Sequence, residues 1–231
     1  VLGKNEASFM KINVILITYN HANYIRKTLE SILMQEVMAD VEIIVADDCS
    51  PDNTVDIIRE YENKTKFSFK YLPHTHNLGY VRNYQQAFKT CTGDYVAIME
   101  GDDYWISANH LQNHINHLEQ HQDTSMSYNR HLRLFVDQER EEIFDWSNDK
   151  AYEFITTEQL ALGNRIGNLS CCVFRGKYIR SLDPKLFEME IADWMLGMYM
   201  GQYGSLIYLK EVTSAYRIHD NGQWSKMDER S

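Results

Sequence analysis

The chain has 231 residues, and its 23 Lys and Arg residues against 33 Asp and Glu residues give a formal net charge of −10. This length allows one large domain, and 44% apolar residues with only 3 Pro exclude collagen-like and disordered proteins. A nucleic-acid-binding protein needs a basic surface, so the acidic composition predicts no nucleic-acid partner.

The longest apolar runs, 12–17 and 41–46, have the length of strands, far below the roughly 20 residues that cross a bilayer. We therefore expect no transmembrane segment and at most peripheral membrane association. Residues 1–10 do not resemble a secretory signal, and we interpret them as disordered or vector-derived. These features predict a cytoplasmic protein, free in the cytosol or at the cytoplasmic face of the membrane, with its four cysteines as free thiols.

Strand and helix patterns alternate over the first hundred residues. The β-branched run over 11–18 predicts a strand, and apolar residues at helical spacing over 25–33 predict a helix. Further strands are expected over 41–46, 67–72 and 94–99, and further helices after Asn53 and over 80–88. Continuous apolar strands alternating with helices are typical of an α/β fold with a central, mostly parallel sheet flanked by helices. Ligands of such sheets bind at the carboxyl ends of the strands.

The pattern is less regular after residue 105. It predicts a helix through Leu111, Ile115 and Leu118, a long strand over 126–136 and a charged loop or hairpin over 138–150. A short helix over 156–162, a strand over 170–174, a helix over 193–203 and one or two strands over 206–217 follow. We therefore expect one domain over 11–231, with a first half (11–105) and a second half (106–231).

Polar residues cluster where the early strands end. They are Thr18-Tyr19-Asn20 after the first strand, Asp47-Asp48 after the second and Glu100-Gly101-Asp102-Asp103 after the fourth. Turns and helix caps explain any one cluster, but three at successive strand ends indicate a shared site. Carboxylates gathered at one edge repel one another unless a cation lies between them, and oxygen ligands suit Mg²⁺ or Mn²⁺. Such an ion would also allow an acidic pocket to accept a diphosphate.

The order and spacing of these motifs resemble those of family 2 glycosyltransferases, which have the GT-A (Rossmann-like) fold. The resemblance extends from Lys11 to about Ser225 and rests on Thr18-Tyr19-Asn20, Ala46-Asp47-Asp48-Cys49-Ser50, the segment 77–83 and the segment 93–105. It implies a nucleoside-diphosphate sugar as donor, a divalent metal and inversion at the anomeric carbon, in polysaccharide or glycoconjugate synthesis. The first half then binds the donor, and the second half binds the acceptor and carries the catalytic base.

Carried over to this sequence, the resemblance assigns the donor-binding residues. Tyr19 lies against the nucleobase, and Asp48 accepts hydrogen bonds from the base or ribose. The other residues of this group are Thr18, Asn20, Asp47, Asn77, Arg82 and Asp102. Glu100-Gly101-Asp102 takes the place of the family's Asp-x-Asp motif, with a longer side chain at its first position. Asp102 and Asp103 are the predicted metal ligands, for Mn²⁺ or Mg²⁺, and a UDP-sugar is the favoured donor.

The second half supplies the remaining roles that the resemblance implies. Asp193 is the predicted catalytic base, at a place where the family usually has Glu-Asp and this chain has Ala192-Asp193. A helix N-cap is the alternative for Asp193. His219 belongs to a segment whose histidine approaches the metal or diphosphate, and it is the third metal candidate. Trp105 and Trp194 could line an acceptor pocket for a glycan or lipid-linked glycan, with core packing as an equal alternative.

The sequence is compatible with two alternative functions. One is a non-catalytic nucleotide-sugar or glycan-binding module of the same fold, which Glu100 and Ala192 keep open. The other is a sugar-nucleotidyltransferase, which would need a Gly-rich, basic loop where this chain has Thr18-Tyr19-Asn20-His21. The oligomeric state is not predicted.

Histidines at helical spacing are a further candidate for a metal site. His110, His114, His117 and His121 could form a zinc site, but the sequence places no Cys or carboxylate beside them. The adjoining apolar stripe predicts instead that they lie on a solvent-facing flank of their helix. The vicinal pair Cys171-Cys172 lies in a strand pattern, for which packing is the better interpretation.

Overall fold

The computed structural model describes residues 10–144, 150–189, 193–220 and 222, so the predictions for residues 1–9 and Ala192 lie outside the described residues. The first half contains β1 (Lys11–Thr18), α1 (Ile25–Leu33), β2 (Asp40–Asp47), α2 (Thr54–Arg59), β3 (Ser68–Tyr71), α3 (Tyr80–Thr90), β4 (Tyr95–Glu100) and β5 (Tyr104–Trp105). The second half contains α4 (His110–Gln120), β6 (Thr124–Phe135), β7 (Arg140–Phe144), β8 (Tyr152–Ile155), α5 (Thr157–Ala161), β9 (Cys172–Arg175), α6 (Gly176–Ile179), α7 (Asp193–Met200) and β10 (Ser205–Ile218).

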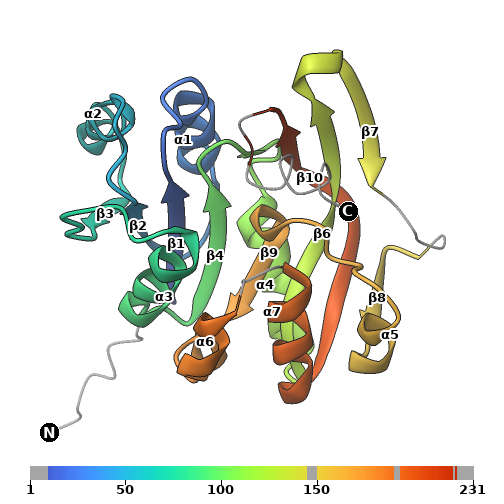
Figure 1. Cartoon of the computed structure of the whole chain (residues 1–231). Coiled ribbons are helices and arrows are strands. Elements are labelled where there is room, and N and C mark those ends of the chain that lie inside the picture. Colours follow the sequence, from blue (N-terminus) through green and yellow to red (C-terminus); the bar gives the residue numbers. More distant parts are fainter. Residues whose placement is uncertain (1–9, 145–149, 190–192, 221, 223–231) are drawn as a thin grey trace, which may run out of the picture.

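These strands form one curled sheet in the order β3-β2-β1-β4-β9-β6-β10-β5, with β7 added to β6 and β8 added to β10 (Figure 1). The first four strands of this order are mutually parallel. Their carboxyl ends therefore share one edge, as the sequence predicts. The second half departs from the mostly parallel pattern, because β9 pairs antiparallel with both β4 and β6.

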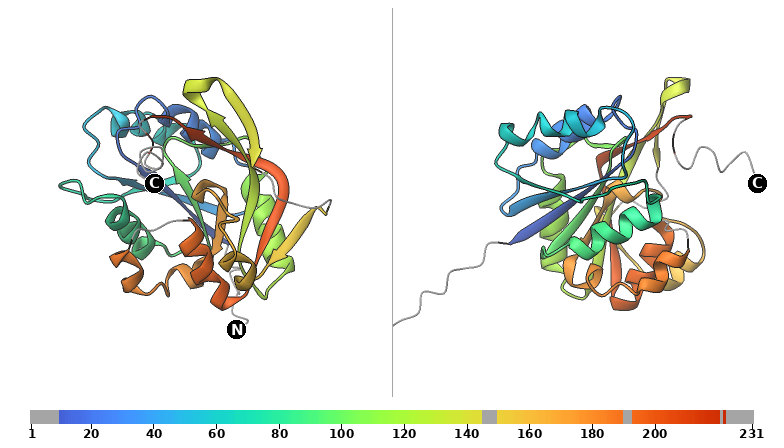
Figure 2. Two further views of the ribbon diagram at one scale, coloured as in Figure 1. Left: turned by 45° about the vertical axis from the view of Figure 1, so that its right-hand side comes forward. Right: turned by 60° about the vertical axis from the view of Figure 1, so that its left-hand side comes forward.

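Apolar side chains cover both faces of the sheet because alternate residues of a strand point to opposite sides. On one face, Ile12, Val14 and Leu16 of β1 pack in a cluster with apolar residues of α1, α2 and α4. On the other face, Ile15 and Ile17 belong to a cluster with residues of α3, α5, α6 and α7. Figure 2 shows helices on both sides of the sheet. Full burial of each such aliphatic side chain contributes about 1.5–3 kcal/mol, so β1 is fixed in the centre of the fold.

Most predicted elements of the second half are present with shifted ends. The helix expected over 156–162 is α5, and Thr156 caps it together with Gln159 in a reciprocal capping box. The strand expected over 170–174 begins only at Cys172, after a 3-10 turn over Leu169–Cys171. The last segment, expected as one or two strands, is the single long strand β10. Its pairing with β6 has register shifts near Val212, so β10 bends without being interrupted.

The predicted exposure of the α4 histidines is wrong for His110 and His114, which are fully buried. Helix α4 contacts β10 as well as β6, so a flank that the apolar pattern leaves polar is also covered. His110 stacks on the indole ring of Trp105, with ring centroids 4.4 Å apart, and its Nδ1 lies 2.8 Å from the hydroxyl of Thr213. His114 Nδ1 lies 2.8 Å from the hydroxyl of Ser127. These two histidines therefore belong to a polar network inside the second half.

Two further sequence predictions can be compared with the described residues. All four cysteines are free thiols, and Cys171 and Cys172 are buried in the core, which confirms their interpretation as packing residues. Among the described helices, none combines the length and apolar character needed to cross a bilayer.

Candidate active site

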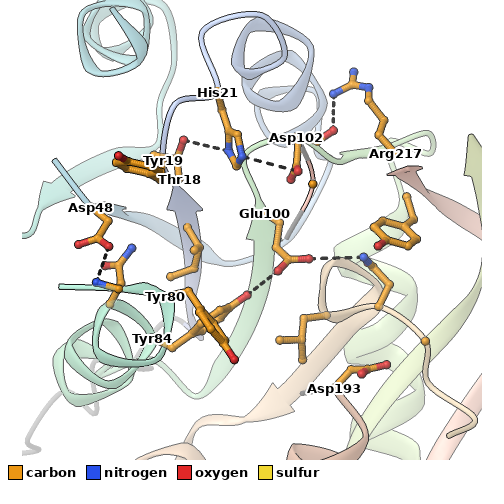
Figure 3. A pocket seen from close by; sticks show the side chains of 18 of the residues that line it. Thr18, Tyr19, His21, Asp48, Tyr80, Tyr84, Glu100, Asp102, Asp193 and Arg217 are labelled. Atoms are coloured by element: carbon orange, nitrogen blue, oxygen red, sulfur yellow. Dashed lines mark hydrogen bonds and ion pairs between the residues drawn. The ribbon is translucent and has the colours of Figure 1, made fainter. Parts of the chain in front are cut away.

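A cavity of about 660 Å³ opens at the carboxyl ends of β1, β2 and β4 and extends to the start of α7 (Figure 3). The first half contributes, among others, Thr18, Tyr19, Asp48 and Asn77 to its walls. The second half contributes Asn168, Asp193, Trp194, Tyr216 and Arg217. The cavity thus brings together most of the predicted site residues, from both halves of the chain.

The end of β1 places Tyr19 at the wall of the cavity with its side chain 46% exposed, as a face for a planar ligand would require. Thr18 is buried beneath it, and its hydroxyl lies 3.2 Å from Nδ1 of His21. Asn20 has a left-handed backbone with φ of 59°, which turns the chain away from the strand. Asn20 is not among the residues that line the cavity.

The end of β2 separates the predicted carboxylate pair. The Asp47 carboxylate accepts hydrogen bonds from the amide and hydroxyl of Ser50 and so closes the turn after the strand. Asp48 lines the cavity and accepts hydrogen bonds from the amides of Leu78 (2.6 Å) and Gly79 (2.9 Å), next to the start of α3. Only the second carboxylate therefore reaches the cavity.

The loop before α3 carries two further predicted donor-binding residues. Asn77 lines the cavity, and its amide donates to the backbone carbonyl of Asp48. Arg82, one turn into α3, donates to the side chain of Gln85 and is not among the cavity-lining residues.

The three acidic side chains at the end of β4 and directly after it, those of Glu100, Asp102 and Asp103, point in different directions. Between Glu100 and Asp102 the chain passes so close to Thr18 and His21 that a Cβ on Gly101 would lie within 2.7 Å of both side chains. Only glycine fits there, which fixes where the flanking carboxylates emerge. Glu100 lines the cavity and accepts a 3.0 Å hydrogen bond from the hydroxyl of Tyr84. Burial, together with the charges of Asp103 and Asp102, raises the pKa of Glu100 well above its usual range.

Asp102 faces the cavity between two imidazole rings. Its Oδ2 lies 3.2 Å from Nε2 of His219 and 3.6 Å from Nε2 of His21. Burial by itself would raise the pKa of Asp102, but the hydrogen bond from His219 and the nearby His21 hold it below its usual value. Asp102 is therefore the ionised carboxylate of the motif.

Asp103 lies outside the cavity lining, and this corrects its prediction as a metal ligand. Its side chain is fully buried, and its oxygens accept hydrogen bonds from Asn168, from Ser170 and from the backbone amide of Arg217. Burial, followed by repulsion from Asp102, raises its pKa to about 7. Because its oxygens accept hydrogen bonds from the segment around the 3-10 turn over Leu169–Cys171 and from β10, Asp103 joins these parts of the second half rather than facing the cavity.

Asp193 begins helix α7 on the opposite wall from Asp102 (Figure 3). Its Oδ2 accepts a 3.0 Å hydrogen bond from the side-chain amide of Asn164. A carboxylate at a helix N-terminus also interacts favourably with the helix dipole, so the start of α7 is a favourable place for this side chain.

The two predicted acceptor-pocket tryptophans have different places. Trp105 is 1% exposed and donates from Nε1 to the carbonyl of Ser170, so it is a core residue and its assignment to the pocket is wrong. Trp194 lines the cavity beside Asp193, remains 40% exposed and donates from Nε1 to the carbonyl of Leu160. Its ring is therefore both accessible and fixed in orientation.

Some cavity residues were not among the predicted ones. Arg217 is the only Lys or Arg that lines the described part of the cavity, and its guanidinium lies near the rings of Tyr24 and Tyr104 and donates to the carbonyl of Asp102. His21 and Asn164 were likewise not predicted. Their contacts with Asp102 and Asp193 join residues remote in sequence. The only signals in the sequence were that His21 follows the first motif and that Arg217 lies two residues before His219.

The residues around Asp102 fit a divalent ion whose coordination a ligand completes. In the described ranges, no group of three or more His, Cys, Asp or Glu side chains is arranged to hold a metal unaided. Mg²⁺ and related ions bind nucleotides through one or two carboxylates with phosphate oxygens, and Mn²⁺ also accepts imidazole nitrogen. Asp102 and His219 are such a donor pair, because Nε2 of His219 lies 3.2 Å from the Asp102 carboxylate, although His219 is buried behind Asp102 and is not among the cavity-lining residues.

Comparison with known proteins gives a family match. The model of glycosyl transferase family 2 matches residues 13–182. An uncharacterised glycosyltransferase of Nostoc sp. is 28% identical over 225 residues, covering 91% of this chain and 65% of the relative. The poly(ribitol-phosphate) beta-N-acetylglucosaminyltransferase TarS of Staphylococcus aureus is 35% identical over 96 residues, which are 41% of this chain and 17% of TarS.

Solved structures show the same fold at lower identity. TarS of S. aureus in complex with UDP-GlcNAc has a TM-score of 0.68 at 21% identity, covering 94% of this chain and 61% of that one. The mannosyltransferase PcManGT from Pyrobaculum calidifontis in complex with GDP-Man and Mn²⁺ has a TM-score of 0.69 at 16% identity, covering 95% and 60%. These likenesses confirm the predicted GT-A fold. The chain spans about three-fifths of the length of these structures.

Proposed function

Because the chain belongs to glycosyl transferase family 2 and is a glycosyltransferase of GT-A fold, we propose that it transfers a sugar from a nucleoside-diphosphate sugar to an acceptor hydroxyl, with inversion. The observation that carries this proposal is the shared cavity, in which Asp102 and Asp193 lie on opposite walls. A donor between them would present its diphosphate to one carboxylate and its anomeric carbon to the other.

The donor end of the cavity has the groups that a nucleoside needs. The accessible ring of Tyr19 offers a face for the base, and Asp48 and Asn77 offer polar groups at the same end. We favour a uridine nucleotide, a choice supported by the UDP-GlcNAc bound to TarS, and the GDP-Man bound to PcManGT makes guanosine the alternative. Asn20, Asp47 and Arg82 act from outside this wall, by shaping its turns and the start of α3.

The diphosphate end is acidic and therefore favours a metal-bound donor. We assign Asp102 and His219 as the groups that would hold Mn²⁺ or Mg²⁺ together with the diphosphate. Such an ion, when bound, neutralises charge that develops on the departing nucleoside diphosphate. Arg217, held beside the carbonyl of Asp102, adds a fixed positive charge to the same wall.

Asp193 is the proposed general base. It takes the proton of the acceptor hydroxyl while the hydroxyl oxygen forms its bond to the anomeric carbon. The bond from that carbon to the diphosphate oxygen breaks on the opposite face, and the electron pair leaves with the nucleoside diphosphate. A single displacement of this kind inverts the anomeric centre and needs no covalent enzyme intermediate.

The acceptor enters beside Trp194, whose accessible indole ring offers an apolar face to a sugar. We propose a glycan or a lipid-linked glycan as acceptor, in polysaccharide or glycoconjugate synthesis. Because the chain covers only part of its relatives, this assignment concerns the activity that the domain contributes to the whole protein.

Ligand-dependent melting tests the donor and metal assignments together. UDP and GDP are added with and without Mn²⁺ to the wild type, to Asp102→Ala and to Asp56→Ala, which removes an exposed carboxylate on α2. We expect UDP to raise the melting temperature of the wild type more with Mn²⁺ than without it. Asp102→Ala should lose this Mn²⁺-dependent increment, and Asp56→Ala should keep it.

Three outcomes would contradict parts of the proposal. Stabilisation by UDP that ignores both Mn²⁺ and Asp102→Ala would refute the metal site. No stabilisation by UDP or GDP would refute the donor class. Nucleotide binding without release of UDP from UDP-GlcNAc, or of GDP from GDP-mannose, with a glycan panel or water as acceptor would favour the non-catalytic binding module.

A further inference from the structure

The side chain of Asn164 joins the loop after α5 to the start of α7. Its Nδ2 donates to Oδ2 of Asp193 at 3.0 Å, and no donor to the other oxygen, Oδ1, is found in the described part of the chain. We propose that Asn164 is the positioning residue of Asp193, holding Oδ2 so that Oδ1 remains the proton acceptor. This inference rests on the proposed role of Asp193 as base.

The amide of Asn164 can face Asp193 in only one orientation. Its Oδ1 accepts hydrogen bonds from the backbone amides of Ile166 (3.0 Å) and Gly167 (3.3 Å). A flipped amide would set its NH₂ group against these two donors, so the backbone fixes which end of the side chain is the donor. The loop therefore determines that Nδ2–H points at the carboxylate.

The loop and α7 are also packed in a fixed relation to each other. The indole Nε1 of Trp194, the residue after Asp193, donates to the carbonyl of Leu160 in α5 at 2.7 Å. Further along α7, the side chain of Ile166 occupies the space beside Gly197, where a Cβ would lie 2.2 Å from its Cδ1. Since Ile166 is 1% exposed, neither partner can move without disturbing the core.

The chemistry of an amide suits this position. The other groups that interact electrostatically with Asp193 include Glu100, Tyr216, Cys171 and Cys172, none of which is a permanent cation. A Lys or Arg in the place of Asn164 would form an ion pair and reduce the basicity of the carboxylate. A neutral donor orients one oxygen and leaves the other free to accept a proton.

The substitution Asn164→Asp tests the donating role of Nδ2 separately from the accepting role of Oδ1. An aspartate can still accept from Ile166 and Gly167, but it replaces the donor that faces Asp193 by a second acceptor. Asn116→Asp, on the exposed side of α4, is a control with the same change of charge. Turnover is measured as release of UDP from UDP-GlcNAc or of GDP from GDP-mannose, whichever nucleotide stabilises the wild type.

We expect Asn164→Asp to lower kcat about 10- to 100-fold, as loss of a group that orients a reacting side chain does, while the donor KM and the nucleotide-induced rise in melting temperature stay within about twofold. Asn116→Asp should leave all three unchanged. Should Asn164→Asp not fold, Asn164→Ser serves instead, because its hydroxyl can accept from the loop but is too short to reach Asp193. A kcat within twofold of the wild type in a folded variant would overturn the proposal.

Asp193→Asn, measured in parallel, separates this inference from the function on which it rests. An inactive Asp193→Asn with a fully active Asn164→Asp overturns only the positioning role. An active Asp193→Asn overturns the base assignment, and with it the positioning role.

Discussion

The two halves of the chain contribute to the cavity in different ways. In the first half, Tyr19, Asp48 and Asp102 follow three parallel strands that are neighbours in the sheet, so the topology itself brings them together. In the second half, Asp193 begins a helix and Arg217 lies near the end of a long strand, and hydrogen bonds with Asn164 and with Asp103 hold them at the cavity. The proposed donor-binding groups are thus positioned by regular secondary structure, whereas the proposed base is positioned by contacts with a loop.

The interiors of the two halves also differ, in the polarity of the side chains that they bury. Strands β1, β2 and β4 are packed almost wholly by aliphatic side chains. The second half buries polar groups, among them His110, His114 and Asn129, in a network between α4, β6 and β10. Polar networks fix one arrangement because each group needs its partner, and they make stability depend on pH.

The largest expected effect separates catalysis in the second half from binding in the first. Asp193→Asn should lower kcat about 10²- to 10⁴-fold, because an amide cannot accept the proton of the attacking hydroxyl. The UDP-induced rise in melting temperature should remain, since the nucleoside end of the cavity is unchanged. Turnover within tenfold of the wild type would show that catalysis does not depend on this helix.

The next largest expected effect is the pH dependence of the free energy of unfolding that a buried histidine causes. Burial lowers the pKa of His114 to about 3, while the unfolded chain has the ordinary value of 6.5. Below pH 6.5 the imidazole of His114 is therefore protonated in the unfolded state but stays neutral in the folded state. The free energy of unfolding consequently falls as the pH falls. Between pH 7.5 and pH 5 this amounts to about 2 kcal/mol for His114.

His114→Gln isolates this contribution. In urea unfolding, the loss of stability from pH 7.5 to pH 5 should be about 2 kcal/mol smaller in the variant than in the wild type. The raised pKa of Asp103, about 7, has the opposite sign and is common to both proteins, so it cancels in the difference. His76→Gln, in an exposed loop, is the matched control and should keep the wild-type slope. Equal slopes for His114→Gln and the wild type would refute the buried neutral state of His114.

The smallest effect concerns the first half. Tyr19→Ala should weaken UDP binding by about 1 kcal/mol, or fivefold, the low end for base stacking, because the ring is only half covered. Isothermal titration calorimetry measures this change, and kcat at saturating donor should stay near that of the wild type. Ile143→Ala, which removes another exposed apolar side chain, should have no effect. A lowered kcat with unchanged affinity would mean that the first half also takes part in catalysis.

The sequence predicted which residues of the first half gather at the cavity, for a physical reason. A parallel α/β pattern sends consecutive strand ends to one edge, so Thr18, Asp48 and Asp102 could be placed together without knowledge of side-chain directions. It could not tell Asp102 from Asp103, because adjacent residues point in different directions once the chain turns. Only the packed loops around Asn168 and Ser170 decide that Asp103 is withdrawn from the cavity.

The sequence by itself thus determined the α/β class, the succession of strands and the sheet edge at which the cavity lies, since these follow from local periodicity and from the short loops between neighbouring elements. The tertiary structure decided which carboxylate faces the cavity, that Trp105 and His114 are buried, and that Asn164 meets Asp193. These features depend on contacts between residues far apart in the chain. Local sequence patterns contain no information about such contacts until the elements have packed together.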